Sequence, residues 1–217
     1  MKNIIKKLLR LYNRLKYGTI VMAHHVYNEN NNDKNGITIK EFKSFIEKNK
    51  KNIISTRELL KAKIKANKIA LTIDDGYDDV YKTIFPICLA YNIPFTIFII
   101  IDKINEEGFL SSKEIVEMLN SGLVTLGSHG LSHVILTNSN VDLEKEISFS
   151  KQYLENLFNI PIEYFAFSHG QFNKKIVKLV YSANYKKSFG ASFFSSSRNV
   201  APRINITHLC RNESFIK

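Results

Sequence analysis

The stretch Leu71-Thr72-Ile73-Asp74-Asp75-Gly76-Tyr77 is an apolar run that ends directly in two adjacent carboxylates and a glycine. A short apolar run bounded by turn residues is typical of a buried strand, which we predict over 68–73. Two carboxylates at the end of such a strand repel each other and lose solvation, so they need a cation or a shared proton. The alternative is an ordinary Asp-Asp-Gly surface turn, and this stretch by itself leaves both interpretations open.

Apolar, strand-like runs alternate with helical patterns on both sides of this stretch. Such alternation is typical of an α/β fold with a largely parallel sheet, and its order suits a barrel. Two polar stretches, 28–36 and 194–199, are predicted to be surface loops that do not separate domains. We predict strands over 19–26, 68–73, 94–101, 124–127, 164–167 and 187–194, and helices over 40–49, 55–65, 79–91, 111–120, 143–158 and 173–183.

A pair of histidines follows the predicted strand 124–127, in the segment Gly127-Ser128-His129-Gly130-Leu131-Ser132-His133. We expect one helical turn to bring the two imidazoles to the same side of the chain. Two neutral imidazoles with one carboxylate form the three-ligand set of a catalytic divalent cation, for which Zn²⁺ is the default and Co²⁺ or Ni²⁺ are alternatives. A surface or core histidine pair without a metal is the competing interpretation.

Composition limits the classes of protein that this chain can belong to. Its 217 residues with 44% hydrophobic content suffice for one domain with a real core and exclude a disordered chain. Cys88 and Cys210 are too few for a disulfide framework and are consistent with a reducing compartment. The net charge of +11 raises the question of a nucleic-acid partner, but no recognised nucleic-acid motif accompanies it. We therefore expect no nucleic-acid partner.

The first eighteen residues carry six cations and no acid. Apolar residues there recur at three- and four-residue steps, which predicts a basic amphipathic leader helix over 1–18 ahead of a single domain over 19–217. Residues 1–16 would either contact a membrane surface or pack on the domain. No secretory signal and no membrane-length apolar run is visible, so we expect a cytoplasmic protein, with attachment to the inner face of the membrane as an option.

Two short motifs resemble those of a known family. Thr72-Ile73-Asp74-Asp75-Gly76 resembles a T-F-D-D-G motif with Ile for Phe, and 129–133 resembles H-(S/T)-x-x-H with Gly in the second place. Together with 85–86 and 93–98, they make the chain similar, over about 19–206, to the polysaccharide deacetylases, the chitin-deacetylase-like carbohydrate esterases. This resemblance implies a distorted (β/α) barrel of about seven parallel strands, with the site at their carboxyl ends.

The resemblance also implies roles for individual residues. It assigns Asp75, His129 and His133 as metal ligands and Asp74 as the general base that takes a proton from the attacking water. A general acid must then protonate the departing amine, and a histidine is expected for this step.

Two histidines compete for the role of general acid. His24, in Val21-Met22-Ala23-His24-His25-Val26, resembles the histidine of a subgroup whose early strand contains M-Y-H-x-V, and we favour it. His208 is the competitor, near the place of the family's late motif. We expect the neighbouring His25 to be structural or exposed, because neighbours on a strand point in opposite directions.

The third motif departs from the family pattern. The chain has Phe165-Ala166-Phe167-Ser168-His169-Gly170, with Ser where a proline is usual, and the basic partner of Asp74 is not identified there. Arg203 is a candidate for orienting Asp74 or for substrate binding, and a surface or structural ion pair is the alternative. His169 is a second candidate for substrate binding, or it simply fills the turn.

These features predict a hydrolase of carbon–nitrogen bonds other than peptide bonds. The predicted reaction is metal-dependent removal of an N-acetyl group from an amino sugar in a polysaccharide or glycan precursor. A deformylase acting on a formamido sugar is one alternative, because the same metal chemistry hydrolyses other amides. A carbohydrate-binding protein of the same fold without catalytic activity is the other alternative.

Overall fold

The computed structural model describes residues 12, 15–28, 36–192 and 199–211. The predicted leader helix over 1–18 therefore lies mostly outside the described residues. Most of the predicted loop 194–199 and most of 28–36 lie outside them too.

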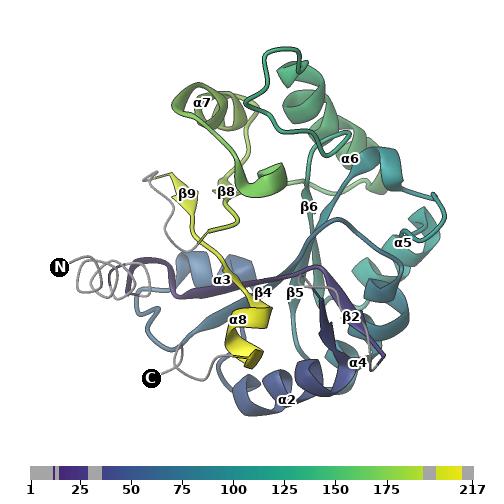
Figure 1. Cartoon of the computed structure of the whole chain (residues 1–217), viewed down its shortest axis with the longest axis vertical. Coiled ribbons are helices and arrows are strands. Elements are labelled where there is room, and N and C mark those ends of the chain that lie inside the picture. Colours follow the sequence, from purple (N-terminus) through teal and green to yellow (C-terminus); the bar gives the residue numbers. More distant parts are fainter. Residues whose placement is uncertain (1–11, 13–14, 29–35, 193–198, 212–217) are drawn as a thin grey trace.

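Eight parallel strands form the main sheet, in the order β10-β1-β4-β5-β6-β7-β8-β9. The outermost strands β9 and β10 are separated in sequence only by Pro202 and Arg203, so the sheet must curl until its two edges approach each other (Figure 1). The predicted distorted (β/α) barrel is thus confirmed. The strands are β1 Thr19–Ala23, β4 Ile69–Ile73, β5 Phe95–Ile99, β6 Val124–Ser128, β7 Tyr164–Ala166, β8 Lys187–Phe189, β9 Val200–Ala201 and β10 Ile204–Asn205.

The strand count differs from the expected number of about seven. The additional strands β9 and β10 have two residues each, which is too short for a period-two pattern to show in the sequence. The predicted strand over 19–26 also differs, since it breaks at His24 into β1 and β2 (His25–Tyr27). Strand β2 pairs with β3 (Gly36–Thr38) in a separate two-stranded parallel sheet.

Helices surround the sheet, and several begin at sequence-encoded caps (Figure 1). Thr38, Ser55 and Ser111 each form a capping box with the glutamate three residues later. Two predicted helices contain a π-helical turn at their start. The helices are α2 Ile39–Asn49, α3 Thr56–Lys61, η1 Val80–Ile84, α4 Phe85–Ala90, η2 Ile101–Lys103, α5 Ser112–Asn120, η3 Lys145–Phe149, α6 Ser150–Phe158, η4 Ser168–Gly170, α7 Lys174–Ser182 and α8 Ile206–Arg211.

The buried apolar side chains form two clusters that follow the alternation of the strands. The larger cluster includes Val21 and Leu71, whereas the smaller includes their neighbours Ile20 and Ala70. Because side chains alternate between the two faces of a strand, Thr72 and Asp74 continue the series that starts with Ala70. Asp74 is thereby directed to the same side as the smaller cluster. No helix among the described residues has the length and apolar character needed to cross a bilayer.

Candidate metal and hydrolytic site

The predicted site residues gather at one end of the parallel sheet. His24 follows β1, Asp74 and Asp75 follow β4, and His129 follows β6. Parallel strands that share a sheet place their carboxyl ends at the same edge, so residues distant in sequence become neighbours there. Asp74 donates its backbone N–H to the carbonyl of Ala23 at 2.9 Å, which ties the ends of β1 and β4 together.

Asp75, His129 and His133 form a compact cluster. The Nε2 atoms of both histidines lie 3.3 Å from Asp75 Oδ1, and one ligand atom from each residue lies within 4.8 Å of the others. Asp75 Oδ1 is buried and has no hydrogen-bond partner among the described residues. The structure thus brings the three predicted ligands together around an unsatisfied carboxylate oxygen.

The hydrogen bonding of His129 determines which of its nitrogens faces this oxygen with a lone pair. Its Nδ1 lies 2.8 Å from the carbonyl of Ala166, and a carbonyl only accepts, so Nδ1 carries the proton. In the neutral ring, the Nε2 lone pair then points toward Asp75 Oδ1, which is unfavourable unless a cation or a proton lies between them. The donor set therefore fits a divalent cation such as Zn²⁺.

The charges of the cluster oppose the effect of burial. Burial alone would lower the pKa of His129, but Asp74 and Asp75 outweigh this effect, and the pKa of His129 is raised. Burial would raise the pKa of Asp75, but the adjacent histidines outweigh it and the pKa falls below its usual range. Burial, together with the neighbouring His129, lowers the pKa of His133. Positive charge is thus favoured on His129 and disfavoured on His133.

The two histidines meet through a loop and not through the predicted helical turn. Residues 129–133 are not helical, and both Gly130 (φ 88°) and His133 (φ 60°) have left-handed backbone conformations. The ring centroids of His129 and His133 nevertheless lie 5.0 Å apart. The expectation of a helical turn was wrong because spacing does not distinguish a turn of helix from a compact loop of the same length.

Glu146, a residue that the sequence analysis missed, holds this loop. Its carboxylate is 4% exposed and accepts hydrogen bonds from Leu131 N (2.8 Å), Ser132 N (3.2 Å) and Ser132 Oγ (2.5 Å). A Cβ atom at Gly130 would lie 2.7 Å from Glu146 Oε2, which explains why Gly stands where the family motif has Ser or Thr. This glycine was the one feature of the sequence that indicated a side chain packed closely against the loop.

Arg203 binds Asp74 through two parallel hydrogen bonds. Its two terminal nitrogens lie 2.6 and 2.7 Å from the two carboxylate oxygens, and its Nε donates to the carbonyl of Gly190 at 2.7 Å. Burial alone would raise the pKa of Asp74, but Arg203, followed by His129, outweighs it and lowers the pKa. The Arg203 side chain has no exposed surface, so the surface ion pair is excluded and direct contact with a substrate finds no support.

The candidates for the general acid occupy different surroundings. The Nδ1 atom of His24 is buried and has no hydrogen-bond partner among the described residues, and the charge of His24 contributes to the lowered pKa of both Asp74 and Asp75. His208 is exposed on α8. This geometry favours His24 over His208.

His25 faces a different group from its neighbour. Its Nδ1 lies 3.4 Å from Asp79 Oδ2, and its ring lies 3.7 Å from that of Tyr77 and 4.9 Å from that of Tyr27. These contacts agree with the structural role that we expected for His25.

The unusual third motif lies directly beside the histidine pair. Ser168 Oγ donates to the carbonyl of His129 at 2.9 Å, and the ring of His169 lies 4.5 Å from that of His133. His169 is exposed, so its ring is accessible from the solvent at the edge of the cluster. The motif thus supports the histidine pair, and a substrate-binding role of His169 stays a prediction.

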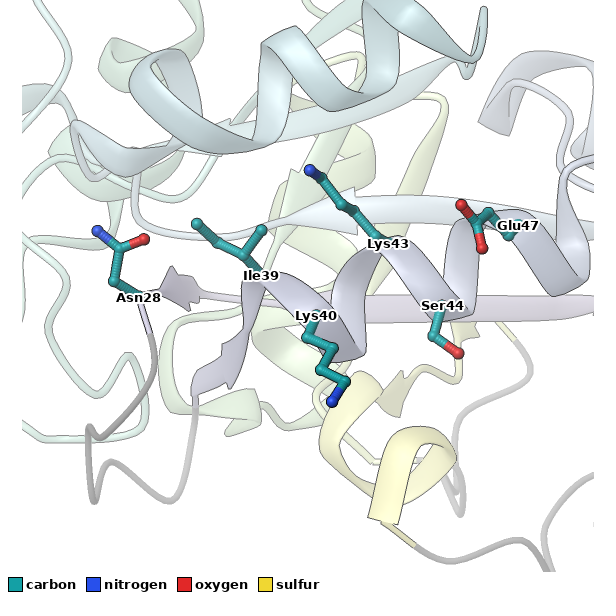
Figure 2. A pocket seen from close by; sticks show the side chains of 6 residues that line it. All are labelled: Asn28, Ile39, Lys40, Lys43, Ser44 and Glu47. Carbon is teal, nitrogen blue, oxygen red and sulfur yellow. The ribbon is translucent and has the colours of Figure 1, made fainter.

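A shallow depression of about 540 Å³ lies elsewhere on the molecule, along helix α2 (Figure 2). None of the candidate site residues lines it, and we assign it no role. Its lining residues are Asn28, Ile39, Lys40, Lys43, Ser44 and Glu47.

Comparisons with known proteins agree with this geometry. A poly-beta-1,6-N-acetyl-D-glucosamine N-deacetylase of Staphylococcus aureus (strain MRSA252) is 28% identical over 143 residues, which are 59% of this chain and 49% of the relative. The chain spans about half the length of the curated relatives that it matches.

Two solved structures share the fold. The structure of IcaB from Ammonifex degensii matches with a TM-score of 0.77 at 18% identity, over 89% of this chain and 95% of that one. The Streptococcus pyogenes deacetylase PplD in complex with acetate matches with a TM-score of 0.73 at 23% identity, over 80% and 83% of the two chains. A family model described as polysaccharide deacetylase matches residues 61–188, more than half of the chain, and the chain therefore belongs to the polysaccharide deacetylase family.

Proposed function

We propose that this chain is a metal-dependent hydrolase that removes the N-acetyl group from amino-sugar residues of a polysaccharide. The observation that carries the proposal is the buried, unsatisfied Asp75 Oδ1 with two imidazole nitrogens 3.3 Å away, next to an arginine-bound second aspartate. Membership in the polysaccharide deacetylase family supports the same reaction class.

Asp75, His129 and His133 would hold the divalent cation, with Zn²⁺ as the first choice. When bound there, the cation would supply Lewis-acid polarisation of the amide carbonyl and activation of water. The protein contributes the orientation of the ligands. Ala166 fixes the tautomer of His129, and Glu146 fixes the loop that carries His133.

Asp74 is suited to accept the proton of the attacking water. Arg203 keeps its carboxylate ionised and fixes its plane with two hydrogen bonds. Asp74 Oδ2 lies 3.8 Å from His129 Nε2 and Asp74 is not part of the three-residue cluster, which supports a role for this carboxylate beside the proposed cation site. Asp74 thus combines proximity to the cation site with a rigid position, as a general base requires.

His24 is suited to return a proton to the departing amine. An amine leaves an amide readily only when its nitrogen is protonated, so the reaction needs a proton donor as well as a base. The Nδ1 of His24 is buried at the same strand edge and makes no hydrogen bond within the described residues, so its donor capacity is not already used.

The Staphylococcus relative suggests the first substrate to test. Its printed name specifies poly-β-1,6-N-acetyl-D-glucosamine, so we propose an N-acetylglucosamine polymer as the substrate class. Hydrolysis of formamido sugars and binding without turnover stand as the two competing proposals.

The decisive experiment compares the two adjacent aspartates. Metal content and acetate release from a β-1,6-linked N-acetylglucosamine oligomer are measured for the wild type, Asp75→Ala and Asp74→Asn, with the exposed Asp102→Asn as a matched control. Asp75→Ala should lose metal and activity together, whereas Asp74→Asn should keep the metal and lose turnover. Wild-type activity should disappear on chelation and return with Zn²⁺ or Co²⁺.

Three outcomes would contradict parts of the proposal. Equal metal loss in both aspartate variants would refute the division of roles. Bound metal with formate release but no acetate release would favour the deformylase. Bound metal with no turnover on acylated amino sugars would favour the binding protein.

A further inference from the structure

Three basic segments meet at the end of the barrel opposite the candidate site. Residues 15–17 precede β1, the loop 62–68 precedes β4, and Lys187 is the first residue of β8. All three stand at the amino ends of parallel strands, and parallel strands place their amino ends on one side of the sheet. Thr19 N donates to the carbonyl of Lys68 at 3.0 Å, which joins the first two segments directly.

Lysines surround the ring of Tyr17 at this end. The Nζ of Lys16 lies 4.9 Å and that of Lys187 lies 5.2 Å from the ring centroid. Burial, followed by the positive charges of Lys16 and Lys65, lowers the pKa of Lys187 to about 8. Three ammonium groups are thus held near one another, and none of the three forms an ion pair with an acid in the described part of the chain.

Acidic groups do not balance this charge. The sequence contains no Asp or Glu before Glu29 and none between Glu58 and Asp74, although the latter interval holds four lysines. Glu58 accepts hydrogen bonds from Ser55, and Glu163 pairs with Arg57 and Lys186. The two acids in the neighbouring segments are therefore already occupied.

Exposed apolar side chains accompany the lysines. Ile64 is 79% exposed, Leu15 58% and Tyr12 55%, and these are the three most exposed large apolar side chains among the described residues. Ile64 stands between Lys63 and Lys65, an arrangement in which an apolar side chain can enter a lipid surface while its neighbours reach the headgroups.

We propose that this basic end, defined as residues 12, 15–17, 61–68 and Lys187, docks on a membrane surface that contains anionic lipids. The clustered ammonium groups supply attraction to negatively charged headgroups, and the exposed apolar side chains supply shallow insertion. Charge complementarity selects this occupant over a second copy of the chain, because two copies of the basic end would repel each other.

Docking through the basic end would set the direction in which the candidate site faces. With the amino ends of the strands on the lipid, the carboxyl ends that carry Asp75 and His129 face away from the membrane. The site would then act on glycan that extends beyond the lipid surface. The docking itself does not depend on the proposed reaction, since it rests on residues outside the candidate site.

Vesicle sedimentation of the full chain tests the docking. Vesicles of phosphatidylcholine alone are compared with vesicles that contain one third phosphatidylglycerol, at about 0.1 M salt. The test variant replaces Lys16 and the exposed Lys61 and Lys63 of the basic end with Gln. Its matched control replaces three exposed lysines outside the basic end, Lys40, Lys43 and Lys113.

The wild type should bind the anionic vesicles and not the neutral ones. Each lysine removed from the surface should weaken binding about fivefold, so the test variant should bind roughly 100-fold more weakly. The control variant should bind within a few-fold of the wild type.

A second variant distinguishes loss of docking from loss of folding. Ile64→Ser changes a largely exposed side chain, so it should preserve the thermal unfolding midpoint and still weaken binding roughly tenfold. Failure of the wild type to bind anionic vesicles would overturn the proposal, and so would equal loss of binding in the test and control variants. Because this experiment measures vesicle binding, a negative result would not contradict the proposed hydrolysis, which is tested by acetate release.

Discussion

Replacing Arg203 with Met gives the sharpest test of how the fold supports the candidate base. The guanidinium is fully buried, lies 5.3 Å from the Phe98 ring centroid and makes two short hydrogen bonds to Asp74. Methionine fills much of the same volume but leaves the Asp74 carboxylate buried without a partner. The carbonyl of Gly190 also loses its donor.

The expected loss of stability follows from burial. Removing one partner of a buried ion pair costs about 3–5 kcal/mol, because the remaining charge is left uncompensated. For a chain of this length, each kcal/mol shifts the unfolding midpoint by about 2–4 °C, so a decrease of roughly 6–20 °C is expected at neutral pH. Removing both charges, in Arg203→Met with Asp74→Asn, should recover part of this loss because neither position then carries a buried charge.

The pH dependence gives an independent check on the same pair. In the wild type the folded-state pKa of Asp74 is lowered, so its contribution to stability is present above the ordinary pKa near 4 and is lost as the pH falls through the folded value. In Arg203→Met, burial without the arginine should raise this pKa, and protonation should then favour the folded state. The stability difference between the two proteins should therefore shrink as the pH falls.

Urea unfolding of the metal-free chains at pH 7 and near pH 4.5 measures all four members of the double-mutant cycle. A coupling free energy of at least about 2 kcal/mol between the two positions is expected at pH 7. An Arg203→Met variant as stable as the wild type would refute the reasoning. So would a double variant that recovers nothing.

Four further substitutions address the loop and the general acid. Glu146→Gln should lower metal affinity roughly 10- to 100-fold in a chelator competition, because a neutral amide accepts the hydrogen bonds of Leu131 N and Ser132 N more weakly than a carboxylate does, and unchanged affinity would contradict the positioning role. Gly130→Ala should destabilise the fold by about 1–3 kcal/mol in urea unfolding, because its φ is left-handed and its Cβ would crowd Glu146; wild-type stability would show that the loop adjusts freely. His24→Asn should abolish acetate release while metal content is unchanged, and His208→Asn should retain activity; the reverse pattern would assign the general acid to His208.

The sequence was sufficient to place most of the site, because strand ends are visible as apolar runs that stop at polar residues. Asp74, Asp75 and His129 each follow such a run, and a parallel sheet brings these ends together without further information. Local patterns also predicted the helix starts, since Thr38, Ser55 and Ser111 cap them through short-range hydrogen bonds.

The residues that hold the site in place were harder to predict. Glu146 lies near the start of the predicted amphipathic helix over 143–158, where an acid usually faces solvent, and nothing local indicates that it is buried against the loop after β6. Arg203 was recognised only as a candidate, because its partner is 129 residues away and its position depends on two strands of two residues each. Such partners depend on tertiary contacts, which periodicity does not encode.

Left-handed backbone conformations recur at the candidate site. Eight non-glycine residues in the described part of the chain have left-handed φ values. Asparagine and aspartate tolerate this conformation best, and five of the eight are asparagines outside the site: Asn67, Asn92, Asn105, Asn159 and Asn184. The other three are Asp75, His133 and His169. Each such residue costs about 1–3 kcal/mol and persists only where its surroundings enforce it.

These three strained residues are also neighbours in space. Asp75 Oδ1 lies 3.3 Å from the Nε2 of His133, and the ring of His133 lies 4.5 Å from that of His169. Helical or extended backbone at these positions would direct the side chains elsewhere, so the strain is what makes the carboxylate and the imidazoles converge. A cluster that only stabilised the fold would not need three such conformations, and binding of the proposed divalent cation would account for their cost in free energy.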